Sequence, residues 1–280
     1  LDTITREVIN GGSNVQYGEG QVTGRHLLVG GEATGNHYFT VRAVRKAVRF
    51  LKTMNAPRYE GSYWAIIHPD CSYDIQDDPD WKRPHEYKDT SNIYDDEIGK
   101  IAGVRFIETT EAKVFHADDL TEGARDLTVK SASGKVLTVN EAITTADAAK
   151  LAGREVVIGG ALLEIESASA AAAGSATITL KEAPAATPTA STAIYPGEAG
   201  AKGRNVYSTL IMGAEAYGTT ELTGGGLEHI VKPLGSAGTA DPLNQRATVG
   251  WKATKVAERL VEAYMIRVET TSTFDETPLT

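Results

Sequence analysis

The clearest pattern of apolar and polar positions lies in "TVRAVRKAVRFLKTM", residues 40–54. Its apolar residues recur three or four positions apart, as one face of a helix requires: Val41, Val44, Ala47, Val48, Leu51 and Met54. Thr40 can cap the first turn, and Pro57 ends the pattern. The residues on the other side are basic: Arg42, Arg45, Lys46, Arg49 and Lys52. The pattern predicts a helix with one apolar and one basic face.

Short apolar runs before and after this helix predict strands. "SYWAIIHP" (62–69) and "IAGVRFIET" (101–109) are typical buried strands, and "CSYDIQDDPDW" between them predicts a short helix or turn. Residues 1–35 contain two Gly-Gly pairs and only short β-prone pieces, "REVI" and "NVQY". We expect them to form an extended arm or hairpin that packs on something else. Strands mixed with one long helix indicate an α+β fold.

The composition changes over residues 117–203. Aromatic residues almost vanish, and Ala, Thr and Ser dominate. "DLTVK", "KVLTV", "REVVIGGALLEIES" and "SATITLK" are strand candidates joined by turn signals and Ala/Pro/Thr-rich connectors. The pattern predicts a small β domain inserted into the main one.

The main-domain pattern returns with "NVYSTLIMGAEAYG" (205–218). Near the end of the chain, Ala257, Leu260, Val261 and Tyr264 are spaced as a helical stripe. The last part of that segment, "YMIRVET", alternates as a strand does.

Composition excludes several classes of protein. Acidic residues outnumber basic ones, 37 to 28, which is unusual for a protein that mainly grips nucleic acid. No apolar run approaches the ~20 residues of a membrane span, and no signal peptide is visible. Cys71 is the only cysteine, which excludes an internal disulfide framework. Because the chain opens with Leu1, we expect a preceding segment to be missing.

Candidate chemistry is sparse. His68, Asp70 and Cys71 could suggest a metal site, but no second ligand pair follows at usable spacing, and a strand end with a buried cysteine is favoured. A second candidate site is a group of four aspartates: Asp74, Asp77, Asp78 and Asp80. Their spacing does not match the alternating ligands of a calcium-binding loop, so a solvated turn is favoured. No nucleophile elbow, phosphate loop or dinucleotide fingerprint is present. We therefore expect no enzyme activity, no cofactor and no metal.

The basic face of helix 40–54 has two interpretations. Its arginines and lysines could touch DNA phosphates weakly and without sequence preference. They could instead pair with acidic residues of this chain or of a neighbouring subunit, which the negative net charge favours.

The stretch "DPLNQRATVGWK", residues 241–252, is densely polar but contains no base or nucleophile. Pro242 can fix a turn, and Trp251 can anchor a segment in a core or an interface. Asp241, Asn244, Gln245 and Arg246 supply the polar groups. We interpret the stretch as a structural joint whose tryptophan is well buried.

The same stretch, with "YSTLIMGAEAYG", "HIVKPLG" and "VRAVRKAVRFLKTMNAPRY", closely resembles the major capsid proteins of tailed phages typified by phage N-four. The resemblance extends to "YWAIIHP" and "IGKIAGVRFIET" and covers most of the chain outside the insertion. It implies the Hong Kong 97-type capsid fold, an α+β fold, here with an inserted small β domain.

The resemblance also implies a division of the chain. Residues 1–35 would supply the N-terminal arm and extended loop, and residues 36–59 the spine helix of a peripheral domain. An axial domain would comprise residues 60–116 and 204–240, with the β domain at 117–203 inserted in it. Residues 241–280 would return to the peripheral domain.

The implied function is a shell subunit of a double-stranded DNA phage, assembling with itself into hexamers and pentamers. Its partners would be packaged DNA and the portal, scaffolding and decoration proteins of the particle, with no membrane. Its location would be the virion, assembled in the bacterial cytoplasm. Two alternatives stay open: a protein-compartment shell of the same fold that encloses protein cargo, and a non-capsid binding module built around the β insertion.

Overall fold

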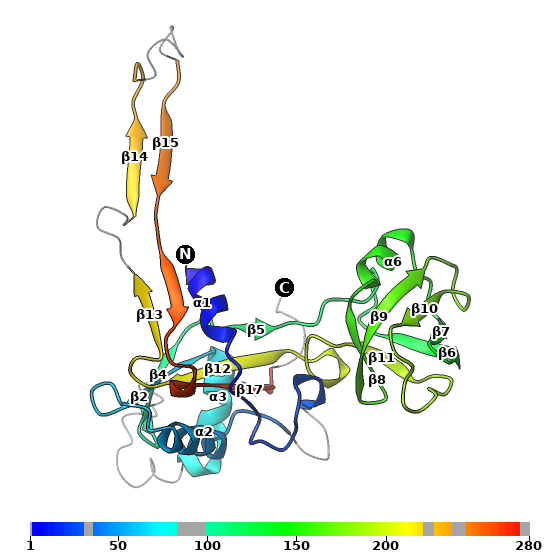
Figure 1. The fold of residues 1–280 in the computed structure, drawn as a ribbon, viewed down its shortest axis with the longest axis horizontal. Helices are drawn as coiled ribbons and strands as arrows, with labels where there is room; N and C mark the ends of the chain where they lie inside the picture. The colour runs from blue at the N-terminus through cyan, green and yellow to red at the C-terminus, as the bar shows by residue number, and fades with distance from the viewer. Residues whose placement is uncertain (1, 31–35, 83–98, 221–226, 237–244, 275–280) are drawn as a thin grey trace.

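A computed structural model describes residues 2–30, 36–82, 99–220, 227–236 and 245–274. Three parts are distinct in Figure 1: a body built on one mixed sheet, a barrel to one side of it, and a long two-stranded ribbon projecting from it.

The body sheet brings together strands from both ends of the chain. Its order is β1 (Val15–Tyr17), β17 (Met265–Thr270), β12 (Val206–Met212), β2 (Tyr63–Ile67), β4 (Val104–Glu108) and β3 (Lys100–Ile101), and β5 (Val114–Phe115) pairs with β12. The pairs β1–β17 and β2–β4 are parallel, and β12 runs antiparallel to both of its main neighbours. The strands predicted at 62–69, at 101–109 and in "YMIRVET" are confirmed as β2, β4 and β17.

Helix α2 (Val41–Thr53) covers one face of this sheet. Val44 and Leu51 are fully buried with Ala65 and Ile67 of β2 in the main core. Thr40 caps the helix, because its hydroxyl accepts a hydrogen bond from the Ala43 amide at 3.2 Å. The predicted amphipathic helix is confirmed. The short helix α3 (Pro69–Asp77) follows β2 directly, where a short helix or turn was expected.

Helix α1 (Asp2–Asn10) lies on the other face of the sheet. Ile9 packs with Leu210, Met212 and Met265 in a second apolar cluster. The prediction of an extended arm with a β-prone "REVI" is therefore wrong, since the described residues 2–30 form α1, β1 and the short 3-10 helix η1 (Arg25–Leu27) on their own chain. "NVQY" does contain a strand, β1. Tertiary contacts override the weak β preference of "REVI".

Six strands from the inserted region close into a barrel in the order β10-β7-β6-β11-β8-β9. They are β6 (Leu127–Ser133), β7 (Val136–Val139), β8 (Glu155–Ile158), β9 (Ala161–Ser169), β10 (Thr177–Leu180) and β11 (Ala193–Pro196). Helix α6 (Thr145–Leu151) begins with a capping box between Thr144 and Asp147. Leucine, isoleucine and valine fill the interior, separately from the body core. This core explains why the region needs no aromatic residues.

The ribbon starts at the body and extends away from it (Figure 1). Its lower part pairs β13 (Tyr217–Thr220) with β16 (Val256–Arg259), and its upper part pairs β14 (Glu228–Lys232) with β15 (Thr248–Lys252). The predicted helical stripe through Ala257 and Leu260 is wrong. Long-range pairing with β13 makes residues 256–259 a strand, and only a 3-10 turn, η4 (Glu262–Tyr264), follows.

Candidate assembly surfaces

The upper ribbon has one apolar and one polar face. Directly paired residues of antiparallel strands lie on the same face, and successive residues alternate between faces. The pairs His229–Trp251 and Val231–Val249 therefore share one face. The opposite face contains the pairs Glu228–Lys252, Ile230–Gly250 and Lys232–Thr248. Apart from Ile230, apolar side chains gather on the first face, which we call the apolar ribbon face: His229, Val231, Val249 and Trp251.

No described residue covers the apolar ribbon face. Val231 is 55% exposed, Val249 69% and Trp251 71%, and every residue of β15 is exposed. An isolated two-stranded ribbon is only marginally stable in water, because it has no third strand or helix to pack against. Exposed apolar side chains on a ribbon of this kind are typical of a surface that another molecule covers.

The sequence-based joint at 241–252 is located partly on this ribbon. Asp241, Pro242 and Asn244 lie outside the described residues, while Gln245 and Arg246 are exposed just before β15. The prediction that Trp251 is well buried is wrong for the subunit, because a ribbon of two strands has no interior. The alternation of apolar and polar residues in "LEHIVK" and "TVGWK" is the sequence signal for this face.

A second apolar surface lies beside the root of the ribbon. Helix α1 covers only part of its face of the sheet, and a groove of about 470 Å³ remains next to it. Apolar and aromatic side chains line much of it: Tyr59, Trp64, Ile66, Ile107, Met212 and Tyr217. Ile107 is exposed at the surface, and Trp64 Nε1 is buried without a hydrogen-bond partner. The sequence does not predict this groove, because the buried and open faces of one strand alternate within "YWAII".

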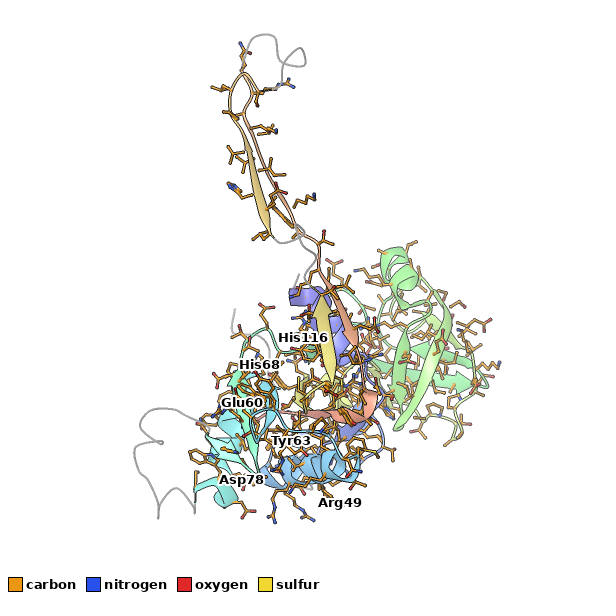
Figure 2. The ribbon with its side chains drawn as sticks, turned by 60° about the vertical axis from the view of Figure 1, so that its left-hand side comes forward. Arg49, Glu60, Tyr63, His68, Asp78 and His116 are labelled. Carbon is orange, nitrogen blue, oxygen red and sulfur yellow. The ribbon has the colours of Figure 1, made fainter. Side chains whose placement is uncertain are left out.

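The basic face of α2 divides into two groups. Arg42 Nε lies 3.3 Å from a Glu19 carboxylate oxygen, and Lys46 donates to the Glu19 carbonyl, so both are paired within the chain. Arg45, Arg49 and Lys52 are exposed and form no ion pair with the residues that the structure describes. Figure 2 shows Arg49 pointing away from the body. Three cations thus remain for an outside partner.

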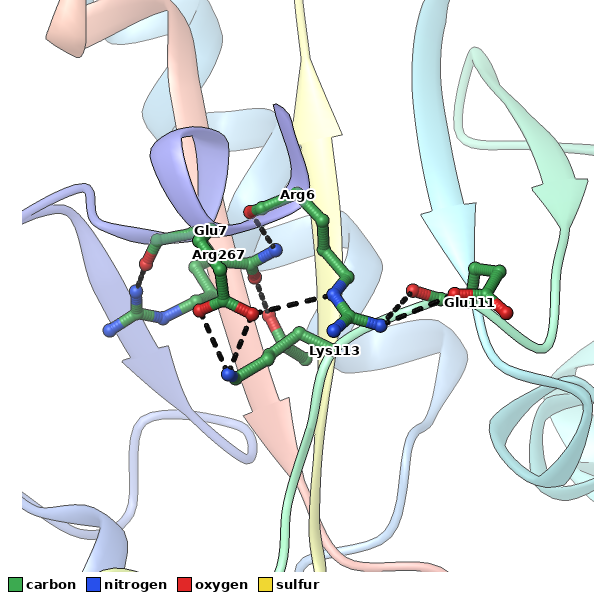
Figure 3. Close-up of polar contacts among 7 residues, drawn as sticks. Arg6, Glu7, Glu111, Lys113 and Arg267 are labelled. Atoms are coloured by element: carbon green, nitrogen blue, oxygen red, sulfur yellow. Dashed lines mark hydrogen bonds and ion pairs between the residues drawn. The ribbon is translucent and has the colours of Figure 1, made fainter. Parts of the chain in front are cut away.

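Helix α1 is fixed to the sheet by a polar cluster (Figure 3). Lys113 Nζ lies 2.8 Å from both Glu7 carboxylate oxygens, and Arg6 donates to the Glu111 carbonyl at 3.1 Å. The hydrogen bond from Lys113 is the main cause that lowers the pKa of Glu7. These contacts hold α1 against the segment between β4 and β5.

His68, Asp70 and Cys71 serve the fold at the start of α3. The His68 ring caps the helix by accepting from the Asp70 amide at 3.2 Å, and burial lowers its pKa. Cys71 is fully buried, with its sulfur 3.7 Å from the Thr270 hydroxyl, and burial raises the pKa of its thiol. The interpretation as a strand end with a buried cysteine agrees with this geometry.

The aspartates that follow each have a different structural contact. Asp74 accepts from the Thr273 hydroxyl at 2.6 Å, and burial raises its pKa. Asp77 pairs with Lys82, and Asp78 accepts from the first amide of α2, that of Val41, at 2.9 Å. Across the described residues, no group of three His, Cys, Asp or Glu side chains could hold a metal ion. None of the described helices is long and apolar enough to cross a membrane.

Comparison with known proteins identifies the family. One solved structure, titled "Acidic stable capsid structure of Helicobacter pylori bacteriophage KHP30", aligns with a TM-score of 0.47 and 9% identity. The alignment covers 96% of this chain and 64% of that chain, so this chain spans about two thirds of its length. No curated protein matches in sequence. The family described as "Phage capsid protein" matches residues 2–220, including the barrel but ending before "DPLNQRATVGWK". With this match over most of its length, the chain belongs to the phage capsid protein family.

Proposed function

We propose that this chain is the major capsid protein of a tailed double-stranded DNA phage. Its copies assemble into an icosahedral shell of hexamers and pentamers through the ribbon. The single observation behind this proposal is the apolar ribbon face, which none of the described residues covers. Family membership supplies the class of protein, and the ribbon supplies the means of association.

A neighbouring copy is the partner that the ribbon needs. A projecting ribbon with exposed Val249 and Trp251 would be an aggregation hazard in a permanent monomer. Aromatic residues such as Trp251 are typical energetic centres of protein interfaces. We expect each subunit to bury a total area in the class of obligate assemblies, about 2,000–5,000 Å². Regular contacts of this kind, repeated around each subunit, produce a closed shell.

The division of the chain follows as part of the proposal. Residues 36–59, with α2, and residues 241–280 belong to the peripheral domain, residues 60–116 and 204–240 to the axial domain, and the barrel is the inserted β domain at 117–203. The ribbon provides the extended loop that residues 1–35 were expected to supply.

Packaged DNA is the proposed contact of the three α2 cations that form no ion pair with the described part of the chain. Arg45, Arg49 and Lys52 lie at i, i+4 and i+7, so they follow one stripe of the helix. Three cations on a chain of net charge −9 support only weak, non-specific, salt-sensitive contact with phosphates.

A matched pair of substitutions on one strand tests the assembly proposal. Val249→Asp places a charge on the apolar ribbon face, and Thr248→Asp places the same charge on the polar face. Electron microscopy and sizing of the purified proteins would measure shell formation, and circular dichroism would check the fold. We expect shells from the parent and Thr248→Asp but not from Val249→Asp. Normal shells from Val249→Asp would contradict assembly through this face, and particles filled with protein cargo would indicate a compartment shell.

A further inference from the structure

The barrel is joined to the body by two neighbouring connections. The chain leaves the body after β5 and returns before β12, and these ends lie close together. A methyl group placed on Gly203 would lie 3.4 Å from the Ala117 side chain. Two adjacent connections alone would allow the barrel to swing about their common axis.

Residues 25–28, which we call the wedge, lie between the body and the barrel (dark blue in Figure 1). Arg25 forms a bidentate ion pair with Glu269 of the body strand β17. Its Nε and one terminal nitrogen lie 2.7 and 2.8 Å from the two carboxylate oxygens. Glu269 is fully buried, and Arg25 also stacks on Phe115, 3.4 Å from the ring centre. A bidentate, stacked arginine has one defined orientation.

The wedge also binds the returning connection from the barrel. The third guanidinium nitrogen of Arg25 lies 3.4 Å from the Glu198 carbonyl. The carbonyl of Leu28, a fully buried residue, accepts from the Ala201 amide at 2.9 Å. Gly200 permits this approach, because a side chain there would begin 2.9 Å from the Leu28 carbonyl.

The barrel side of the junction is rigid as well. Arg154, just before β8, donates to the Glu198 carboxylate at 3.0 Å and to the Asp119 carbonyl at 2.8 Å. It therefore ties the outgoing and returning connections to each other and to the barrel. An unbroken series of polar contacts runs from β17 through Arg25 and Glu198 to Arg154.

We propose that the wedge fixes the direction in which the barrel projects, with Arg25 as the positioning residue. The segment comes from the N-terminal part of the chain, far in sequence from the insertion that it orients. The inference itself concerns a single subunit and does not depend on shell formation.

The test measures a distance between barrel and body in the full chain. Lys52→Cys on α2 and Ser133→Cys on the barrel provide two exposed label sites, while the native Cys71 is buried and stays unlabelled. Spin labels at these sites report the distribution of barrel positions in dilute, unassembled subunits. The wedge is disrupted by Arg25→Ala. It is disrupted independently by Ala201→Pro, which removes the amide donor to Leu28.

Two features keep these variants informative. Arg267 Nε also lies 2.7 Å from Glu269, so Arg25→Ala leaves a cation beside the buried carboxylate. Gly200 has φ −71° and ψ 175°, which suits a residue before proline. Arg6→Ala is the matched control, because Arg6 is an equally sheltered, ion-paired arginine away from the junction.

We expect one narrow distance distribution for the parent and for Arg6→Ala. Arg25→Ala and Ala201→Pro should broaden it, and Arg25→Lys should give an intermediate width, since lysine cannot form the bidentate pair. Parent-like distributions in both folded wedge variants would overturn the proposal, as would equal broadening in Arg6→Ala. If Arg25→Ala does not fold, Ala201→Pro decides the outcome.

Discussion

The barrel and the ribbon are both built from antiparallel strands, yet they differ in where their stabilising contacts lie. In the barrel, closure leaves no free edge along the six strands, and residues such as Leu137 and Ile178 are fully buried. In the upper ribbon all residues but Ile230 are exposed, and the largest, Trp251, points its indole to solvent. The barrel can be stable by its own core, whereas the ribbon depends on contacts with another molecule.

The largest effect on the subunit should follow a change in the barrel core. Ile178→Ala removes a fully buried side chain and leaves a cavity, which typically costs about 2–5 kcal/mol of unfolding free energy. Urea unfolding of the full chain should show an early transition of the barrel. Val136→Ala on the neighbouring strand is the control, and it should cost less than about 1 kcal/mol because Val136 is exposed. Equal losses from both changes would mean that the barrel has no core of its own.

A smaller effect is expected when the whole barrel is removed. Replacing residues 118–202 with a short Gly/Ser linker is feasible, because Ala117 and Gly203 lie side by side. Across the junction the body should lose the hydrogen bonds from Arg25 to Glu198 and from Ala201 to Leu28, about 1–2 kcal/mol together, besides the local bonds that Gly203 and Arg204 form with deleted residues. Thermal unfolding of the shortened protein would measure this loss. Aggregation of the shortened chain would show that the body core includes the barrel.

The smallest effect on the subunit should come from the ribbon. Trp251→Ala should change the unfolding free energy by less than about 0.5 kcal/mol, since the side chain is exposed. The same change should sharply lower particle yield, because truncating a central interface tryptophan usually costs 2 kcal/mol or more of binding energy. Thermal unfolding and particle counting on the same samples would separate the two effects. A large loss of subunit stability would restore the original expectation of a buried anchor.

Local sequence patterns predicted the elements whose structure depends on residues close in sequence. The period of Val44, Val48 and Leu51 predicted α2, because a helix that covers a sheet must be apolar on one face. The loss of aromatic residues after 117 predicted a separate β unit, since a small barrel is filled by aliphatic side chains. An α+β fold followed from these elements.

The errors occur where distant partners decide the structure. Ala257 and Leu260 have helical spacing, but pairing with β13, some 40 residues earlier, makes this segment a strand. Trp251 was expected in a core because tryptophan is usually buried, and no local signal shows that its strand has only one neighbour. The wedge was not anticipated either, because Arg25 and Glu269 are 244 residues apart.

The pairing of β1 with β17 has a consequence for the order of folding during synthesis. Val15 aligns with Arg267, so the body sheet cannot be completed until residues up to Thr270 have left the ribosome. The barrel needs only residues up to Pro196, and its widest strand pairing, Leu127 with Ile194, spans 67 residues, whereas Val15 and Arg267 are 252 residues apart. Domains fold as units as they emerge, and distant pairings form slowly. The barrel should thus fold before α1 and β1 have packed on the body sheet. Pulsed hydrogen exchange during refolding would then show protection of the barrel amides before those of the body sheet.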